Sequence, residues 1–395
     1  MMKYVILTPA IGGMGGSQMF CNNKAKCLKQ SGWEVILIYF QNFDILISDL
    51  KQYSSLWAPK LSYGIQYVLP SQRANIVASV SEYIGSFDEC VIESHMVKLA
   101  MWGELIAEQL SCIHILNPIE EELHPLSDGY TRFMEYKLKR HELLNSSETS
   151  LKRFFRTRYK EEYENYFFTM IPYCSNVTIE NDEEFNPIKA DYTILSIGRL
   201  EKPYILPMID EICSFCISVP EKKINVIFIG ASSSGIVEKQ ISLKMSSSNC
   251  NVYLIGYKYP VPSVYLECAD AAIACANSVL VAANKGVPTI VVDAYDYDAI
   301  GLYGYTTMRL LQRDDEPRVK ISSLLKEVLI DSKYEKKQSV ESTDVDAIEN
   351  IRLQIEYALR SLKNVRKYYK VADIYSLKDY IYCNIKRIGH IIFQR

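Results

Sequence analysis

Apolar residues in the first third of the chain gather in short runs that alternate with longer segments of helical periodicity. Runs with the length and composition of buried strands lie at 3–8, 33–40, 65–69, 89–94 and 112–116. Segments with the apolar spacing of helices lie between them at 17–31, 72–84 and 98–110. Strands that alternate with helices predict parallel βαβ units, so we expect an α/β domain here.

This alternation stops in the middle of the chain and then resumes. Residues 120–180 are rich in Tyr, Phe, Lys, Arg and Glu, and we expect them to be mainly helical. Strand-like runs return at 192–197, 225–229, 251–255, 271–275 and 288–292. They predict a second α/β domain, and from about residue 345 apolar residues recur at helical spacing. We therefore expect domains at 1–187 and 188–372, followed by a helical tail at 373–395.

Composition narrows the class of protein. The chain has 395 residues, which suits two domains, and its 48% apolar and 23% charged residues indicate a globular protein. A net charge of −3 gives no overall attraction to nucleic acid, so we expect no nucleic-acid partner. Eleven scattered cysteines, no secretory signal before the first strand and no run of 18 apolar residues predict a reduced, cytoplasmic protein without a membrane-spanning helix.

Cys213 and Cys216 are the one close pair of cysteines. A redox or zinc pair is one interpretation, but no second pair stands at the spacing of a zinc ribbon. We favour the other interpretation, two small apolar residues on a buried helix face.

The sequence AIGGMGGSQMF at 10–20 directly follows the first strand. Ligands of parallel sheets bind beyond the carboxyl ends of strands, and backbone N–H groups at the start of a helix can hold an anion. The dinucleotide pattern fails because Gln18 stands where a glycine is needed, which disfavours a nicotinamide-dependent oxidoreductase. A tight turn is the alternative, but four glycines cost more ordering entropy than a turn requires, so we favour a ligand contact.

Three other stretches place polar residues just after predicted strands. In VIESH, His95 follows the strand beside Glu93, where it could bond a sugar hydroxyl or cap the next helix. In SIGRLEK, Gly198 allows a turn, and Arg199 and Lys202 suit a diphosphate, although two solvated charges are the simpler interpretation of that stretch alone. In CADAAIACANSVLVAANKGVPTIV, a small-residue turn leads into a helix at 278–285 whose first turn could bind phosphate.

Together these four stretches resemble the GT-B glycosyltransferases, specifically the retaining, nucleotide-sugar-dependent, family-4-like group that builds bacterial surface polysaccharides. The resemblance covers most of the chain in order. It implies two Rossmann-like α/β domains that face a cleft, with a C-terminal helix packing back across both. The donor would lie mainly on the second domain and the acceptor, a glycan or lipid-linked glycan, on the first.

The resemblance also implies roles for single residues. His95, Arg199 and Lys202 would be catalytic, the last two by holding the donor diphosphate. Residues that would bind the donor are Gly15, Gly16, Gly198, Asn277, Ser278 and Val279. No metal or other cofactor is expected, since the nucleotide-sugar is a substrate. Val281 stands where the family usually carries a ribose-binding glutamate, and valine cannot accept a hydrogen bond, so a non-catalytic binding or scaffold protein stays as the alternative.

Basic residues alternate with aromatic ones within 137–160, a composition that suits an anionic lipid surface. We expect peripheral contact with the inner face of the plasma membrane there, with a solvated helix face as the alternative. The tail YIYCNIKRIGHIIFQR at 380–395 is similar in composition, but for this segment we favour packing against the domains.

Overall fold

The structure is a computed structural model. It describes residues 1–13, 15–119, 128–144, 148–166, 178–179, 184–246, 249–334, 349, 351–356, 368–370, 378, 380–382, 384–386 and 388. The chain divides into two compact units. Unit 1 comprises Met1–Gly13, Ser17–Tyr173 and Asp344–Arg395, and unit 2 comprises Met14–Gly16 and Cys174–Thr343. The predicted domain limits at 187/188 and 372/373 stay predictions, because much of 167–183 and 357–377 lies outside the described residues.

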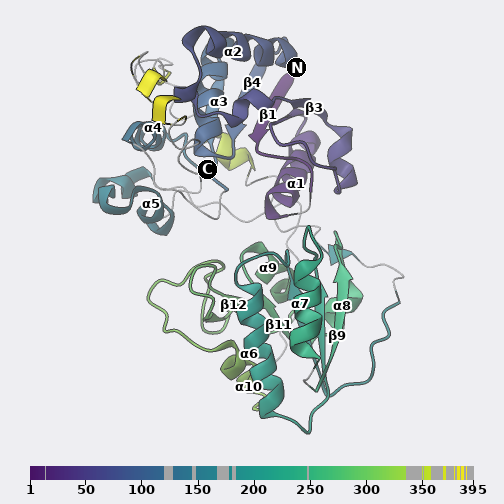
Figure 1. The fold of residues 1–395 in the computed structure, drawn as a ribbon. Helices are drawn as coiled ribbons and strands as arrows, with labels where there is room; N and C mark the ends of the chain where they lie inside the picture. The colour runs from purple at the N-terminus through teal and green to yellow at the C-terminus, as the bar shows by residue number, and fades with distance from the viewer. Residues whose placement is uncertain are drawn as a thin grey trace. The chain divides into compact units, whose positions relative to one another are not determined.

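Unit 1 is built on a five-stranded parallel sheet in the order β3-β2-β1-β4-β5 (Figure 1). Its strands are β1 Met2–Thr8, β2 Glu34–Tyr39, β3 Ser54–Trp57, β4 Glu89–Ser94 and β5 Ile113–Leu116. Its α-helices are α1 Gly16–Gln30, α2 Pro70–Ile84, α3 Val97–Leu110, α4 Asp128–Lys139 and α5 Glu148–Phe155. Fully buried residues on β1 and β4 meet α3 in one apolar core, which explains the continuous apolar runs of those strands.

One predicted strand of unit 1 is wrong. Ile65–Tyr67 is a single 3-10 turn, and Ile65 enters the core from this turn. The strand that pairs with β2 is β3, whose two serines are exposed. Because β3 is at the edge of the sheet, it needs little apolar surface, so the hydrophobic pattern did not mark it.

Unit 2 contains a six-stranded sheet in the order β13-β12-β11-β7-β8-β9. Its strands are β7 Tyr192–Ile197, β8 Ile224–Ile229, β9 Cys250–Gly256, β11 Ala271–Ala274, β12 Thr289–Val292 and β13 Ala299–Leu302. All pairings are parallel except that of β13, which the sequence did not predict. Helices α6 Ile205–Ser218, α7 Ile236–Met245, α8 Ser263–Glu267, α9 Asn277–Asn284 and α10 Ile321–Leu329 accompany this sheet (Figure 1). The short strands β6 Thr178–Ile179 and β10 Val261–Pro262 pair separately. The α/β fold class is confirmed in both units.

The C-terminal part of the chain returns to unit 1. Residues 351–356 are helical, and the periodicity predicted there is confirmed, because Ile351 and Ile355 are both buried. The amide oxygen of Gln354 accepts a hydrogen bond from Lys24 Nζ at 3.0 Å. Among the described residues, no helix combines the length and the apolar character that crossing a bilayer requires.

Candidate functional site

The sheet topology of unit 2 brings two of the predicted stretches to one edge. Strand β7 lies between β8 and β11, and Ile197 is paired with Ile229 on one side and Ala274 on the other. These pairs are at the carboxyl ends of parallel strands. The loop that begins at Gly198 and the turn that leads into α9 therefore emerge side by side, as the sequence predicted for a donor site.

Glycines allow these loops to approach one another closely. The Gly198 N–H donates to the Ile229 carbonyl at 3.0 Å, and Gly230 has a φ of 149°. A Cβ added to Gly230 would lie 1.8 Å from the Gly198 oxygen, which no side chain can tolerate. Gly230 is therefore required so that the backbone before Arg199 can lie against the end of β8.

We expect Gly230→Ala to displace the loop at 198–200, to lower the free energy of unfolding by about 2–3 kcal/mol or more and to abolish donor binding. Gly256→Ala is the matched control at the end of β9. Its φ of 79° is also positive, but no described atom lies within 4 Å of the added Cβ, so only about 1 kcal/mol of backbone strain is expected. Thermal unfolding and donor calorimetry measure both effects. Equal losses in the two variants would contradict the steric explanation.

Arg199 and Lys202 lie in different environments at this edge. Arg199 is exposed, whereas Lys202 is partly buried, and burial lowers the pKa of its ammonium group despite the nearby Cys275 thiol. Burial raises the pKa of Tyr204, which also lies near Cys275 and Arg199. Arg199 lies near Tyr204 and Lys202 lies near Cys275, so two cations with different exposure stand at this edge of the sheet, an arrangement suited to an anion.

The start of α9 is a strained turn. Ala276, directly before the helix, has φ 57° and ψ −139°, a region almost restricted to glycine, and its N–H donates to the Leu310 carbonyl at 2.6 Å. Asn277 is exposed and Ser278 partly exposed, so both side chains reach the surface at this turn. Val279 does not, because its side chain is fully buried and its N–H donates to the Ala276 carbonyl. The donor contact predicted for Val279 is therefore the weakest of this group.

Val281 belongs to the interior of unit 2. Its side chain is 8% exposed and packs in a cluster with Leu195, Ile197 and Ile227. A glutamate at this position would have to bury its carboxylate among apolar side chains. The departure from the family pattern therefore has a structural consequence here, because the helix turns this position toward its own sheet.

The glycine loop after β1 has a packing explanation for its first two glycines. A Cβ added to Gly12 would lie 2.1 Å from the Phe43 carbonyl oxygen, and Gly13, with φ 80°, donates to the Asp44 carbonyl at 2.7 Å. Gly16 is the first residue of α1 and has open space around it, and Gly15 is buried. The turn considered as an alternative thus accounts for Gly12 and Gly13, and the donor contact of Gly15 and Gly16 stays a prediction.

His95 lies beside Glu93, as expected, but its side chain is fully buried rather than directed outward. Its Nε2 is 3.0 Å from Glu93 Oε1, and its Nδ1 is 3.6 Å from Cys21 Sγ on α1. Glu93 in turn accepts hydrogen bonds from Tyr4 and Asn117 and forms a buried ion pair with Lys24. The ring is held inward by this polar cluster, which is the physical reason for the correction, and its predicted sugar contact stays a prediction.

The His95 cluster has a defined charge state. Burial opposes the imidazolium, but the Cys21 thiol and the Glu93 carboxylate outweigh burial and raise the pKa of His95 to about 9. Burial also opposes ionisation of Glu93, but Lys24 and His95 outweigh it and hold the pKa of the carboxyl far below its usual range. A carboxylate with two cations therefore lies inside unit 1 at neutral pH.

The raised pKa of His95 predicts a loss of stability on the alkaline side. Its contribution is complete below the ordinary value of 6.5 and is lost as the pH rises through about 9. We expect the free energy of unfolding to fall by about 2–3 kcal/mol over this interval. Urea denaturation across the interval measures it, and His95→Gln should flatten the dependence. An equally steep fall in the variant would assign the effect to other groups.

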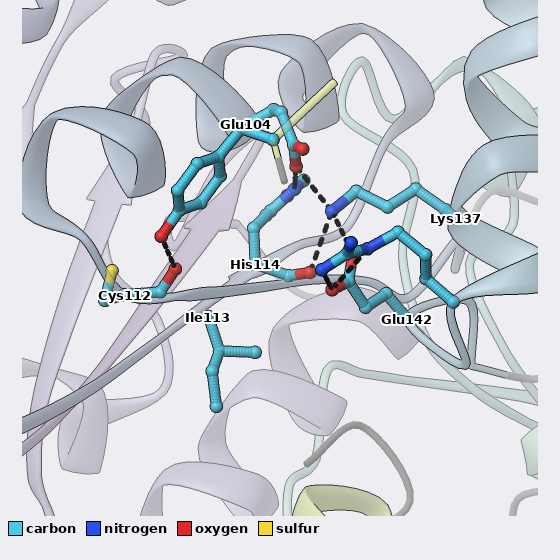
Figure 2. Close-up of a pocket in the computed structure, with 8 residues that line it drawn as sticks. Glu104, Cys112, Ile113, His114, Lys137 and Glu142 are labelled. Carbon is cyan, nitrogen blue, oxygen red and sulfur yellow. Dashed lines mark hydrogen bonds and ion pairs between the residues drawn. The ribbon is translucent and has the colours of Figure 1, made fainter. Parts of the chain in front are cut away.

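A second buried polar cluster surrounds a small cavity in unit 1. Figure 2 shows Lys137 between the carboxylates of Glu104 and Glu142, with His114 beside Glu104. Burial and Lys137 lower the pKa of His114 to about 4, so its ring is neutral at neutral pH. Arg140 pairs with Glu142 at 3.0 Å, so two carboxylates face two cations. The cavity, about 10 Å³, has room for one water at most, which favours a structural role.

This cluster fastens a C-terminal segment to unit 1. The Tyr369 N–H donates to Glu104 at 2.8 Å, and the Tyr368 hydroxyl donates to the Cys112 carbonyl at 2.8 Å. The Tyr369 ring also packs against Phe133, with the ring centroids 5.3 Å apart. Residues 368–370 are thereby tied to α3, α4 and the start of β5.

The stretch at 137–160 is less available to a membrane than its sequence suggests. Lys137 is 1% exposed, and Phe154 and Phe155 are buried in the core, so these three residues are a correction to the predicted contact. Cations of this stretch that pair with neighbouring carboxylates are Lys139, Lys152 and Lys160. Residues 145–147 lie outside the described residues. The solvated helix face considered as the alternative fits these contacts better.

The cysteine pair on α6 fits its apolar interpretation. Cys216 is buried and Cys213 partly buried, and the hydrogen bond with Cys250 together with burial raises the pKa of the Cys216 thiol. Within the ranges that the structure describes, no group of three or more His, Cys, Asp or Glu side chains is placed to hold a metal ion.

Sequence reasoning missed two contributions to the sheet edge at which Arg199 and Asn277 lie. Gly230 follows a strand directly, so the rule that singled out Gly198 could have found it. Tyr257 follows the strand predicted at 251–255 by two residues, as Arg199 follows its own strand, so the same rule could have found it as well. Its hydroxyl donates to the Ala231 carbonyl at 2.9 Å, and burial raises the pKa of this hydroxyl while the nearby Arg199 opposes the rise. Only the tertiary structure brings this ring to the loop of Arg199.

Comparison with known proteins defines the fold. No protein-family model matches the chain, and no curated protein matches it. The chain is similar to the Anabaena protein HepE, solved with UDP and glucose, at 12% identity and a TM-score of 0.59 over 92% of this chain and 100% of that one. It is also similar to the lipopolysaccharide outer core galactosyltransferase WaaB, at 12% identity and a TM-score of 0.51 over 91% and 99%. A Listeria monocytogenes protein assigned as a UDP-N-acetylglucosamine 2-epimerase matches at 12% identity and a TM-score of 0.54 over 93% and 99%. The chain therefore has the GT-B fold, as its sequence predicted.

Proposed function

We propose that the chain is a glycosyltransferase that takes its sugar from a nucleotide-diphosphate donor. The observation that carries the proposal is the edge of the unit 2 sheet, where β7 and β11 bring Arg199 and Lys202 beside the turn at Asn277 and Ser278. Support comes from the fold, which this chain shares with HepE in its complex with UDP and glucose. Cations and a strained helix start at such an edge suit a diphosphate.

The proposed chemistry is charge stabilisation at the leaving group. Arg199 and Lys202 would stabilise the negative charge that develops on the departing diphosphate. Arg199 would donate two parallel hydrogen bonds from its planar guanidinium group, and Lys202 would act as a point charge. Since these residues supply positive charge, we propose that no metal ion takes part. We further propose transfer of a hexose with retention by front-side attack, which needs no base beyond the leaving phosphate.

The acceptor and the setting follow from the sequence resemblance. We propose a glycan or lipid-linked glycan of bacterial capsule, O-antigen or exopolysaccharide synthesis, with peripheral contact at the inner face of the membrane. Support for this finer assignment is the order of the four stretches along the chain and the similarity in fold to WaaB.

A donor screen tests the proposal. The full chain is incubated with UDP-, GDP-, ADP- and CMP-sugars, with and without a chelator, and nucleotide release and donor structure are followed by NMR. Release of a nucleoside diphosphate from one donor class, unaffected by chelation, is expected. Conversion of a donor to an epimer would assign the activity of the Listeria protein instead, and the absence of any nucleotide release would overturn catalysis.

A non-catalytic GT-B protein of polysaccharide assembly is the second candidate. The burial of Val281 favours it, because the family's ribose contact cannot be made from that position. Calorimetry separates the two: donor binding without release of nucleotide supports the scaffold, whereas binding with release supports the transferase.

A further inference from the structure

The last described helix exposes apolar side chains. Residues 378, 380–382, 384–386 and 388 are helical, and Asn384 Nδ2 donates to the Tyr380 carbonyl at 2.9 Å, one turn earlier. The exposed fractions are 49% for Ile381, 63% for Ile385 and 57% for Ile388. Their spacing of four and three residues places them on one face, which we call the isoleucine face.

The surroundings of the isoleucine face are basic. Exposed Lys378 lies one turn before it, and Lys386 Nζ lies 5.0 Å from the ring centroid of Tyr382, which is 57% exposed. Basic residues of the sequence from 376 to 395 are Lys378, Lys386, Arg387, His390 and Arg395, against the single acid Asp379. A helix with an apolar face, an aromatic residue beside it and flanking lysines has the composition of an interfacial membrane helix.

We propose that the isoleucine face lies on an anionic membrane surface and is the membrane-binding element of this protein. Ile381, Ile385 and Ile388 would enter the boundary between headgroups and acyl chains, while Lys378 and Lys386 would meet lipid phosphates. The proposal replaces the packing expected for this tail and specifies the membrane contact of the proposed function. Charge complementarity favours an anionic lipid surface over a second copy of the chain, since two such basic helices would repel each other.

The stretch at 152–160 is the competing surface. Its phenylalanines are in the core and its lysines pair with carboxylates, so it offers no exposed apolar face comparable to that of the three isoleucines. Apolar burial and electrostatic attraction therefore act together on the C-terminal helix and not on the stretch at 152–160.

Sedimentation with vesicles tests the proposal with the full-length protein. Vesicles of phosphatidylcholine alone are compared with vesicles that also contain phosphatidylglycerol, at low and high salt. We expect binding to the anionic vesicles, weakened by salt, and a loss of about tenfold or more in Ile385→Asp. The matched control is Leu243→Asp on α7, which places the same charge at a leucine that is 76% exposed and should leave binding unchanged.

Three results would overturn the proposal: absence of wild-type binding to anionic vesicles, unchanged binding by Ile385→Asp, or loss of binding in Arg156→Gln with binding kept in Ile385→Asp. Light scattering measures the molar mass of the wild type and of Ile385→Asp. A wild-type dimer that dissociates in the variant would show that the isoleucine face is an interface between copies and would overturn the membrane proposal. The site at 385 is exposed, so equal melting temperatures are expected. Donor hydrolysis is measured separately without membranes, and its failure would affect only the proposed function.

Discussion

Replacing Arg199 by alanine is expected to lower donor turnover by about 10²–10³-fold while unit 2 stays folded. Arg199 is exposed at the end of β7, so truncation removes no core contact. Its guanidinium would act on charge that grows on the diphosphate during bond cleavage, so kcat should fall more than donor affinity. Nucleotide release under saturating donor measures kcat, and calorimetry measures affinity.

Lys223→Ala is the matched control for this variant. Lys223 is also exposed, but it stands directly before β8, at the amino edge of the same sheet. Its removal changes the net charge by the same amount without touching the proposed donor edge. If folded Arg199→Ala keeps its turnover, the diphosphate role is wrong. If Lys223→Ala loses as much as Arg199→Ala, the effect is one of overall charge.

The fold was largely predictable because each buried parallel strand contains a short run of buried apolar residues. Strands β1, β4 and β7 stand out for that reason, and their order with the helices specifies parallel pairing. Strand β3 did not, because it is short and exposed at the edge. The turn at Ile65 shows the opposite error, since a short apolar run also marks a buried turn.

The sheet edge proposed to bind the donor was predictable for the same topological reason. Gly198 follows the carboxyl end of β7, and Asn277 follows the carboxyl end of β11. Because these two strands pair in parallel, the two residues come together without further information. The burial of His95 was not predictable, because Cys21, which contacts its ring, comes from α1, 74 residues earlier in the chain. Local sequence shows that a residue can ionise, but its partners decide whether it faces water.

Charged residues gave the largest errors. Lys137 reads as part of a basic surface in the sequence, yet Glu104 and Glu142 compensate its charge inside unit 1. Such pairs have no sequence signature, since their members are distant in the chain or on different elements. Lys24 and Glu93 form a second buried ion pair, which the sequence did not predict, and a substitution of Lys24 can test its contribution.

Lys24→Met is expected to lower the free energy of unfolding by about 3–5 kcal/mol. Both members of its ion pair with Glu93 are 0% exposed, so the variant leaves a carboxylate inside unit 1 with His95 as the nearby cation. The hydrogen bond from Lys24 to Gln354 is lost as well, which loosens the helix at 351–356. The loss should grow as the pH rises through about 9, because His95 then gives up its charge. Urea denaturation at several pH values measures it.

Lys26→Met on the same helix is the matched control. Lys26 pairs with Asp49 at 2.5 Å, but the side chains are 38% and 44% exposed, so a loss of about 1 kcal/mol or less is expected. Should Lys24→Met fail to fold, the double variant Lys24→Met with Glu93→Gln decides, because glutamine keeps an oxygen acceptor for Tyr4 without a buried charge. Recovery of stability in the double variant identifies the uncompensated carboxylate as the cause. Equal instability of both variants would show instead that the lysine stem, through its packing, carries the effect.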